Sequence, residues 1–214
     1  MALVPLFPLE LVLFPKAALP LHVFEPQYRA LLRHCLLHQE PFGVLAIRQG
    51  VEVGGQPSSF AVGTLAHIEE VSRLPDGRSD VLARGGERFR VRRRVEGAPY
   101  PRAEVEPLGD LPSAWYASSV VGELRLAYRA YRRSVRGLGL EVPPFEELPQ
   151  GPESLSWAIA DHLVVELSAR QELLEERRPL KRIRRELSLL RREAIFVDLG
   201  LANRLIRPPR YTVN

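Results

Sequence analysis

The sequence predicts an α+β protein in which a strand-rich half is followed by a helical half. In the first half, short runs alternate apolar and polar residues as half-buried strands do, and glycine, proline and aspartate separate the runs. In the second half, apolar residues recur every three or four positions, which is the spacing of helices that pack together. We therefore predict a β-rich domain over residues 1–111, a helical bundle over 112–196 and a tail over 197–214.

The opening apolar segment, PLFPLELVLFP at residues 5–15, is predicted to be a kinked strand of the core. Its leucines recur at every second position, and its prolines exclude a helix. A secretion signal is not expected, because basic residues should precede the apolar run and the first one here, Lys16, follows it. No other stretch approaches the ~20 apolar residues of a membrane helix. We therefore expect a cytoplasmic protein without a membrane partner, and the single cysteine, Cys35, agrees with this compartment.

Turn signals divide the rest of the first half into five predicted strands. These lie at residues 42–48, 61–74, 79–85, 88–96 and 102–108. Pro75-Asp76-Gly77 is a hairpin signal between the second and the third, and Gly85-Gly86 is expected to form the turn between the third and the fourth. One helix interrupts this half. Pro26 suits its first turn, and its apolar face consists of Tyr28, Leu31, Leu32, Cys35 and Leu36.

The second half predicts three helices. Ser113 is expected to cap the first of them. After a connector rich in glycine and proline at residues 137–152, Ser154 is expected to cap a single second helix that reaches Leu174. Pro179 is expected to open the third. Its apolar residues form a helix-packing seam made of Leu180, Ile183, Leu187, Leu190 and Ala194.

The basic residues are unusual in kind and uneven in position. Only two of the 30 are lysines, and the wealth of arginine suggests a GC-rich, thermophilic bacterial source. Residues 1–111 carry 13 basic and 13 acidic side chains, whereas residues 112–214 carry 17 basic and 13 acidic ones. The net charge of +4 therefore lies wholly in the second half, and a charge of this size is more typical of a soluble surface than of a binding footprint.

Two arginine-rich segments are candidate nucleic-acid sites. If the strand at 88–96 is regular, one face carries Arg88, Arg90, Arg92 and Arg94, and such a stripe could follow a phosphate backbone. The alternative is a solvated face whose arginines pair with Glu104 and Glu106 of the next strand. The basic helix at 177–192 has the same two interpretations, because its leucine seam could simply be buried while its arginines face water.

The sequence patterns that could indicate catalysis or metal binding are weak. His34 and His38 lie one helical turn apart and could hold zinc, but no acidic third ligand is near in sequence. His162, Glu166 and the serines at 154 and 156 could form a hydrolytic triad, but no serine lies on the sharp turn that a nucleophile requires. The phosphate-binding pattern of P-loop proteins is also missing from the sequence. We expect a non-enzymatic protein without a metal ion or cofactor.

Several separated segments together resemble the N-terminal substrate-binding domain of Lon proteases. They match in order along the chain: PLFPLELVLFP (5–15), LPLHVFEPQYRALL (19–32), PFGVLAI (41–47), VGTLAHIEEV (62–71), LPDGRSDVLARGGERFRV (74–91) and IADHLVVELSARQELLEE (159–176). The resemblance covers about residues 3–194. It implies a β-rich pseudo-barrel related to PUA-like folds, with one inserted helix, followed by a helical bundle.

The resemblance also implies a function in recognising protein substrates. Lon proteases continue into an ATPase module and a protease domain, which are not found in these 214 residues, so we expect a stand-alone, non-catalytic adaptor. Its expected partners are unfolded or client polypeptides and a separate Lon-type ATPase or protease. Candidate contacts are Phe14, Phe24 and Tyr28, whose alternative role is core packing. RNA or DNA binding through the two arginine-rich segments is the second hypothesis. No oligomeric state is predicted.

Overall fold

The computed structural model describes residues 2–49, 58–112, 118–136 and 147–198. It divides into two compact units, of which the first ends at Gly109 and the second begins at Asp110. This division lies near the predicted boundary at residue 111. The limits of the three predicted domains remain a prediction. Almost all of the predicted tail, and the predicted cap Ser113, fall outside the described residues. None of the described helices has the length and apolar character that crossing a membrane requires.

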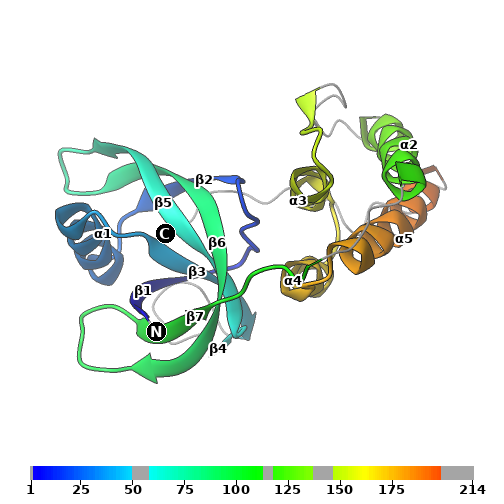
Figure 1. Ribbon diagram of the computed structural model, residues 1–214. Coiled ribbons are helices and arrows are strands. Elements are labelled where there is room, and N and C mark those ends of the chain that lie inside the picture. The colour runs from blue at the N-terminus through cyan, green and yellow to red at the C-terminus, as the bar shows by residue number, and fades with distance from the viewer. Residues whose placement is uncertain (1, 50–57, 113–117, 137–146, 199–214) are drawn as a thin grey trace. The chain divides into compact units, whose positions relative to one another are not determined.

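The first unit is a closed barrel with one helix inserted (Figure 1). Its strands are β1 (Ala2–Leu9), β2 (Ala18–Val23), β3 (Phe42–Gln49), β4 (Ser58–Ser59), β5 (Val62–Arg73), β6 (Ser79–Val95) and β7 (Arg102–Pro107). Five of them follow one another in the order β1-β7-β6-β5-β3, and β3 closes the ring by pairing in parallel with β1. Helix α1 (Pro26–His38) lies between β2 and β3. The predicted barrel with its inserted helix is therefore confirmed.

Strand β6 is the longest element of the barrel and corrects one prediction. It runs without a break through Gly85 and Gly86, which we predicted to form a turn. A Cβ atom on Gly85 would lie 2.2 Å from the carbonyl oxygen of Phe14, and one on Gly86 would lie 2.5 Å from the ring of His67. The two glycines therefore permit close packing inside a strand and do not reverse the chain. The hairpin at Pro75-Asp76-Gly77 is confirmed, with Gly77 at a φ of +83°.

The opening segment is only partly a strand. β1 ends at Leu9, and Val12, Leu13 and Phe14 remain buried although they lie outside any strand. The chain then forms β2, a strand that we did not predict. Its side chains alternate between buried and exposed, so that Leu19, Leu21 and Val23 enter the core.

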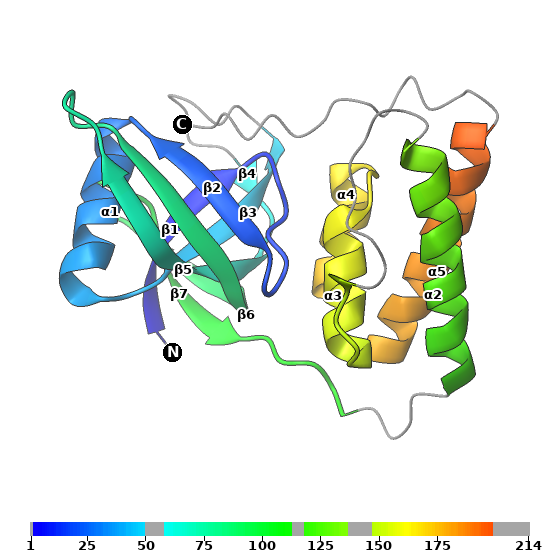
Figure 2. The same ribbon diagram turned by 90° about the horizontal axis from the view of Figure 1, so that it is seen from above.

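The second unit consists of helices (Figure 2). They are α2 (Ser118–Arg136), α3 (Pro152–His162), α4 (Leu167–Glu175) and α5 (Pro179–Asp198), and α2 lies alongside α5. Ser154 was wrongly predicted as a cap, because Gly151 occupies the cap position and Pro152 the first turn of α3. The start of α5 at Pro179 and the burial of Ile183 and Leu190 are confirmed.

The predicted second helix is in fact two helices, α3 and α4, which was not apparent from its apolar spacing. The chain is extended at Leu163, where φ is −74° and ψ is 122°. Side chains form hydrogen bonds with the backbone N–H and carbonyl groups that lose their helical partners at this interruption. The hydroxyl of Tyr131 accepts from the Val164 N–H at 3.0 Å, and the Arg170 guanidinium donates to the Leu163 carbonyl at 2.8 Å. These bonds stabilise the interruption because buried backbone groups need partners.

Candidate functional site

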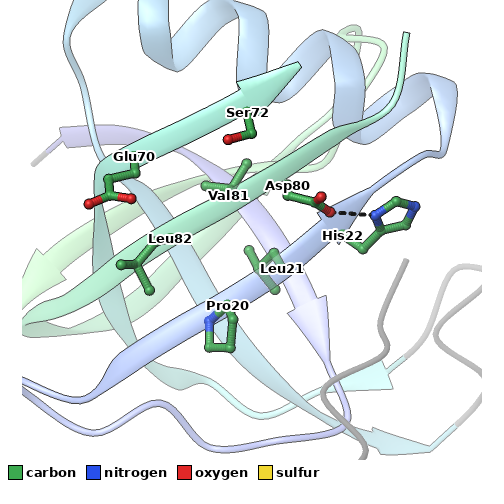
Figure 3. Close-up of a pocket in the computed structure, with 8 residues that line it drawn as sticks. All are labelled: Pro20, Leu21, His22, Glu70, Ser72, Asp80, Val81 and Leu82. Carbon is green, nitrogen blue, oxygen red and sulfur yellow. Dashed lines mark hydrogen bonds and ion pairs between the residues drawn. The ribbon is translucent and has the colours of Figure 1, made fainter. Parts of the chain in front are cut away.

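A pocket opens on the outer face of the barrel where β2, β6 and β5 lie side by side (Figure 3). Its volume is about 310 Å³, at the small end of the range for ligand sites. Its lining residues are Pro20, Leu21 and His22 from β2, Asp80, Val81 and Leu82 from β6, and Glu70 and Ser72 from β5.

The strand register explains which side chains reach this face. Alternate residues of a strand point to opposite sides, so the burial of Leu19, Leu21 and Val23 leaves Pro20 and His22 pointing outward. Pairing across the strands then produces two rows of three residues. One row contains Pro20, Leu82 and Glu70, and the other contains His22, Asp80 and Ser72 (Figure 3).

The charges around the pocket are unevenly compensated. Two arginines beside it are held by carboxylates outside it, because Arg78 pairs with Asp76 at 2.6 Å and Arg84 binds both oxygens of Glu69. Hydrogen bonds from Arg78 also lower the pKa of Asp76. Within the pocket, Asp80 contacts His22 Nδ1 at 2.6 Å.

Glu70 is the pocket carboxylate without a counter-charge. In the described part of the chain, its carboxylate makes neither an ion pair nor a hydrogen bond. Its side chain projects beside Leu82 on the outer face (Figure 3). The first row of the pocket therefore joins two apolar residues to one uncompensated negative charge.

Strand β2 has one open edge. It pairs with β6, and no further strand pairs with it among the residues that the structure describes. The N–H of Gly85 donates to the carbonyl of Ala17 at 2.9 Å. Because hydrogen-bonded pairs alternate along an antiparallel ladder, the backbone groups of Ala18, Pro20 and His22 face away from β6. Proline fits this position since it has no N–H to lose from the ladder.

The three predicted aromatic contacts differ in accessibility. Phe24 directly follows β2, is 37% exposed, and has its ring 6.1 Å from that of His22. Phe14 is fully buried, and Tyr28 stacks on Phe7 in the core with ring centroids 4.0 Å apart. For Phe14 and Tyr28 the structure shows the alternative role, core packing. Phe24 is the member of the set that a partner can reach.

The predicted arginine stripe does not lie on one face. A β-bulge between Val91 and Arg93 interrupts the alternation of side chains. As a result, Arg94 is the cross-strand partner of the buried Ala103 on strand β7. Arg88 is only 5% exposed, whereas Arg90 is exposed. Glu106 pairs with Arg92 at 2.6 Å, and Glu104 pairs with Arg93 at 2.5 Å. Pairing with these two glutamates is what the alternative interpretation predicted.

The basic segment at 177–192 lies in α5 from Pro179 onward, and several of its arginines pair with glutamates. Arg191 pairs with Glu123 of α2 at 3.1 Å, and Arg185 pairs with Glu172 of α4. Arg192 contacts Glu193 at 2.8 Å. Ile183, Leu187 and Leu190 of the leucine seam are buried, as the second interpretation predicted, but Arg182 of the same segment is buried as well and does not face water.

The candidate metal and catalytic residues lie on α1, on α3 and at the start of α4. The rings of His34 and His38 lie 4.5 Å apart, but the described residues contain no group of three side chains that could hold a metal ion. The Ser156 hydroxyl is buried and bonds to Glu186 and Arg182. Glu166 lies at the start of α4. Burial lowers the pKa of His162.

A buried polar cluster in the helical unit was not predicted from the sequence. Arg182 is fully buried, donates to both carboxylate oxygens of Asp110 at 3.1 Å, and lies 3.5 Å from the ring centroid of Trp157. Its Nε donates to Ser156 at 2.9 Å, and Ser156 donates to Glu186 at 2.6 Å. Burial raises the pKa of Glu186 to about 8. Its second oxygen has no partner among the described residues.

The sequence of this chain matches the model of a known family. The family is the ATP-dependent protease La (LON) substrate-binding domain, and its model matches residues 3–192. The chain belongs to this family. The resemblance noted in the sequence is confirmed, and so is the α+β fold that it implied. The matched Lon domain is a substrate-binding domain and not a catalytic one.

This chain is also similar in sequence to individual Lon proteins. Lon protease 2 of Desulfotalea psychrophila is 30% identical over 198 residues, which cover 91% of this chain and 26% of the relative. Lon protease 1 of Thermus thermophilus is 33% identical over 152 residues, covering 68% of this chain and 19% of the relative. A crystal structure of a Lon N-terminal domain protein from Xanthomonas campestris superposes with a TM-score of 0.65 and 28% identity, covering 88% of this chain and 98% of that one. The chain therefore spans about a quarter or less of the curated relatives' length.

Proposed function

We propose that this Lon substrate-binding domain binds extended polypeptide segments at the outer face of β2, β6 and β5. The observation that carries the proposal is the exposed ring of Phe24, which lies beside a pocket and at the end of a strand with an open edge. Unfolded clients present unpaired backbone groups and apolar side chains. An open strand edge can form hydrogen bonds with the unpaired backbone groups, and an exposed aromatic ring can pack against the apolar side chains.

The proposed role is recognition without catalysis. The match to a substrate-binding domain supports it, and the buried Ser156 hydroxyl is engaged by Glu186 and Arg182. In the finer form of the proposal, the chain acts as an adaptor that presents clients to a Lon-type ATPase or protease. The recognition surface does not depend on whether that protease is a separate protein.

Nucleic-acid binding is the weaker hypothesis. Glutamates compensate Arg92 and Arg93 on the barrel, and Arg185 and Arg191 on α5. A phosphate backbone would have to displace these carboxylates. Binding of RNA or DNA through Arg88–Arg94 or the helix at 177–192 therefore stays a prediction. It requires affinity at 50 mM salt that falls steeply as salt is added.

The test compares two exposed apolar side chains of the barrel unit. Fluorescence anisotropy would measure the affinity for a labelled protein kept unfolded by reduction and carboxymethylation. Phe24→Ala should weaken binding about fivefold, because a half-exposed ring contributes roughly 1 kcal/mol of apolar burial. Leu37→Ala, on α1 outside the proposed surface, is the matched control and should bind as the unmodified chain does. Equal affinities of all three proteins would contradict the proposal.

A further inference from the structure

We infer that the pocket selects extended segments that carry an arginine or lysine, and that such a segment binds as an added strand along β2. This inference rests on the proposed function and specifies its substrate class. It combines three observations, namely the composition of the pocket, the open edge of β2 and the uncompensated charge of Glu70.

The first row of the pocket has the chemistry of a long cationic side chain. Pro20 and Leu82 provide an apolar floor, and Glu70 stands at its far end (Figure 3). Arginine and lysine have an apolar stem and a charged head, and they commonly lay the stem on apolar surface while the head stays in water. A shorter or acidic side chain cannot both cover the apolar surface of Pro20 and Leu82 and pair with the carboxylate of Glu70.

The distances across the sheet allow this arrangement. Adjacent strands are ~4.8 Å apart, so a strand added to β2 would lie ~14 Å from β5. An arginine side chain of ~7 Å and a glutamate side chain of ~5 Å, joined by a hydrogen bond of ~3 Å, span that separation. The arginine stem would then pass over Pro20 and Leu82 before its head reaches Glu70.

The edge of β2 offers a matching set of backbone groups. Ala18 and His22 face outward with both an N–H and a carbonyl, while Pro20 between them offers a carbonyl alone. The strand is short, and its proline weakens indiscriminate pairing with other edges. Side-chain contacts in the pocket therefore have to contribute to binding, which makes the segment's sequence matter.

The surrounding charges favour a cationic occupant over an anionic one. Arg78 and Arg84 beside the pocket are engaged by Asp76 and Glu69, and Arg78 also reaches His22 Nε2 at 3.4 Å. Asp80 and Glu70 remain as the carboxylates of the pocket, and the imidazole of His22 is the group that contacts one of them. A basic side chain meets complementary charge here, and an acidic one meets repulsion.

The first experiment varies the segment. The probe is a labelled ten-residue peptide of alternating threonine and valine with one central test position, added to the full 214-residue chain. Arginine or lysine at that position should bind two- to fivefold tighter than norleucine, which is the range for an exposed ion pair, and glutamate should bind more weakly than norleucine. Equal affinity for arginine and norleucine would overturn the selectivity.

The second experiment varies the pocket. Glu70→Gln should reduce the preference for arginine over norleucine to about one, while leaving the affinity for the norleucine peptide unchanged. Glu96→Gln removes the same charge just beyond the end of β6 and should keep the preference. A preference that survives Glu70→Gln would show that another group recognises the cation.

The third experiment tests the added strand. Every second N–H of such a strand bonds to β2, so an N-methyl group at the test position and one at the next residue should have opposite effects. One peptide should lose at least tenfold in affinity and the other little. Bound peptide should also slow amide exchange at Ala18 and His22. Equal effects of the two methyl groups, or unprotected amides at saturation, would overturn the strand geometry.

The outcomes separate this inference from the proposed function. If the peptides bind and depend on Phe24 but show no preference for arginine, the proposed function stands and the inference fails. If no peptide binds, the inference fails, and if unfolded protein does not bind either, the proposed function is overturned with it.

Discussion

Glu186 offers the sharpest test of the helical unit, through the substitution Glu186→Gln. The side chain is fully buried on α5, and one of its oxygens accepts a hydrogen bond from Ser156 at 2.6 Å. Burial raises its pKa from the usual 4.5 to about 8, although the Ser156 hydrogen bond and the charge of Arg182 oppose the shift. Glutamine keeps the shape of the neutral carboxyl group and cannot ionise, so it isolates the contribution of that one proton.

The sign of the effect follows from which state binds the proton. Between pH 4.5 and about 8, the folded protein keeps Glu186 protonated while the unfolded chain releases the proton. The unfolded state is therefore favoured progressively as the pH rises through this window. Each pKa unit corresponds to about 1.4 kcal/mol, so a shift of about 3.5 units lowers the free energy of unfolding by roughly 5 kcal/mol at most. The glutamine variant does not experience this loss.

The assay is urea unfolding of both proteins at pH 5, 6, 7, 8 and 9. Titrations of all other groups are common to the two proteins and cancel in the difference between their unfolding free energies. We expect that difference to move in favour of the variant by about 3–5 kcal/mol between pH 5 and pH 9. Glu123→Gln is the matched control. It removes an exposed carboxylate that pairs with Arg191 and should not reproduce the change seen with Glu186→Gln.

A particular result would refute the reasoning. If the Glu186→Gln difference changes by less than about 1 kcal/mol across the range, Glu186 ionises near its usual pKa in the folded protein. The buried cluster would then hold an ion pair between Arg182 and a charged Glu186. In that case the variant should be less stable at every pH, because it leaves the buried arginine with fewer counter-charges.

Two further predictions concern the barrel unit. Gly85→Ala should lower the free energy of unfolding by about 2–4 kcal/mol, because the new methyl group would lie 2.2 Å from the Phe14 carbonyl oxygen. Gly109→Ala, which meets no atom within 4 Å, should have little effect, and equal urea midpoints would contradict the packing role of Gly85. The pKa of Cys35 is raised to about 12 by burial, so iodoacetamide at pH 8 should label it only after urea unfolds the chain. Labelling of the native protein at the rate of a free thiol would refute this.

Local patterns in the sequence predicted the elements whose cause is local. Pro26 and the apolar spacing of Tyr28, Leu31 and Cys35 predicted α1, and the same residues are buried in the structure. Pro75-Asp76-Gly77 predicted the hairpin between β5 and β6, because a turn depends on the backbone preferences of its own residues. The family resemblance then supplied the barrel, which no single segment could have indicated.

Errors arose where distant residues decide the local structure. Gly85 and Gly86 have the composition of a turn, yet they lie in a strand because Phe14 and His67 pack against them from other parts of the chain. The interruption between α3 and α4 depends on Tyr131, which precedes it by more than 30 residues and bonds the freed backbone. Apolar spacing does not contain this information, since it reports which face is buried and not what lies against it.

The candidate site illustrates the same limit more strongly. The alternation of Leu19, Leu21 and Val23 could have identified β2, and Pro20 could have marked it as an edge strand. That Pro20, Leu82 and Glu70 lie in one row follows from the register of three strands, with two bulges in the pairing of β5 with β6. A shift of one residue in either pairing would turn Glu70 or Leu82 to the opposite face. The proposed preference for a cationic segment is therefore a property of the register, and Glu70→Gln tests it at the position where the register places the charge.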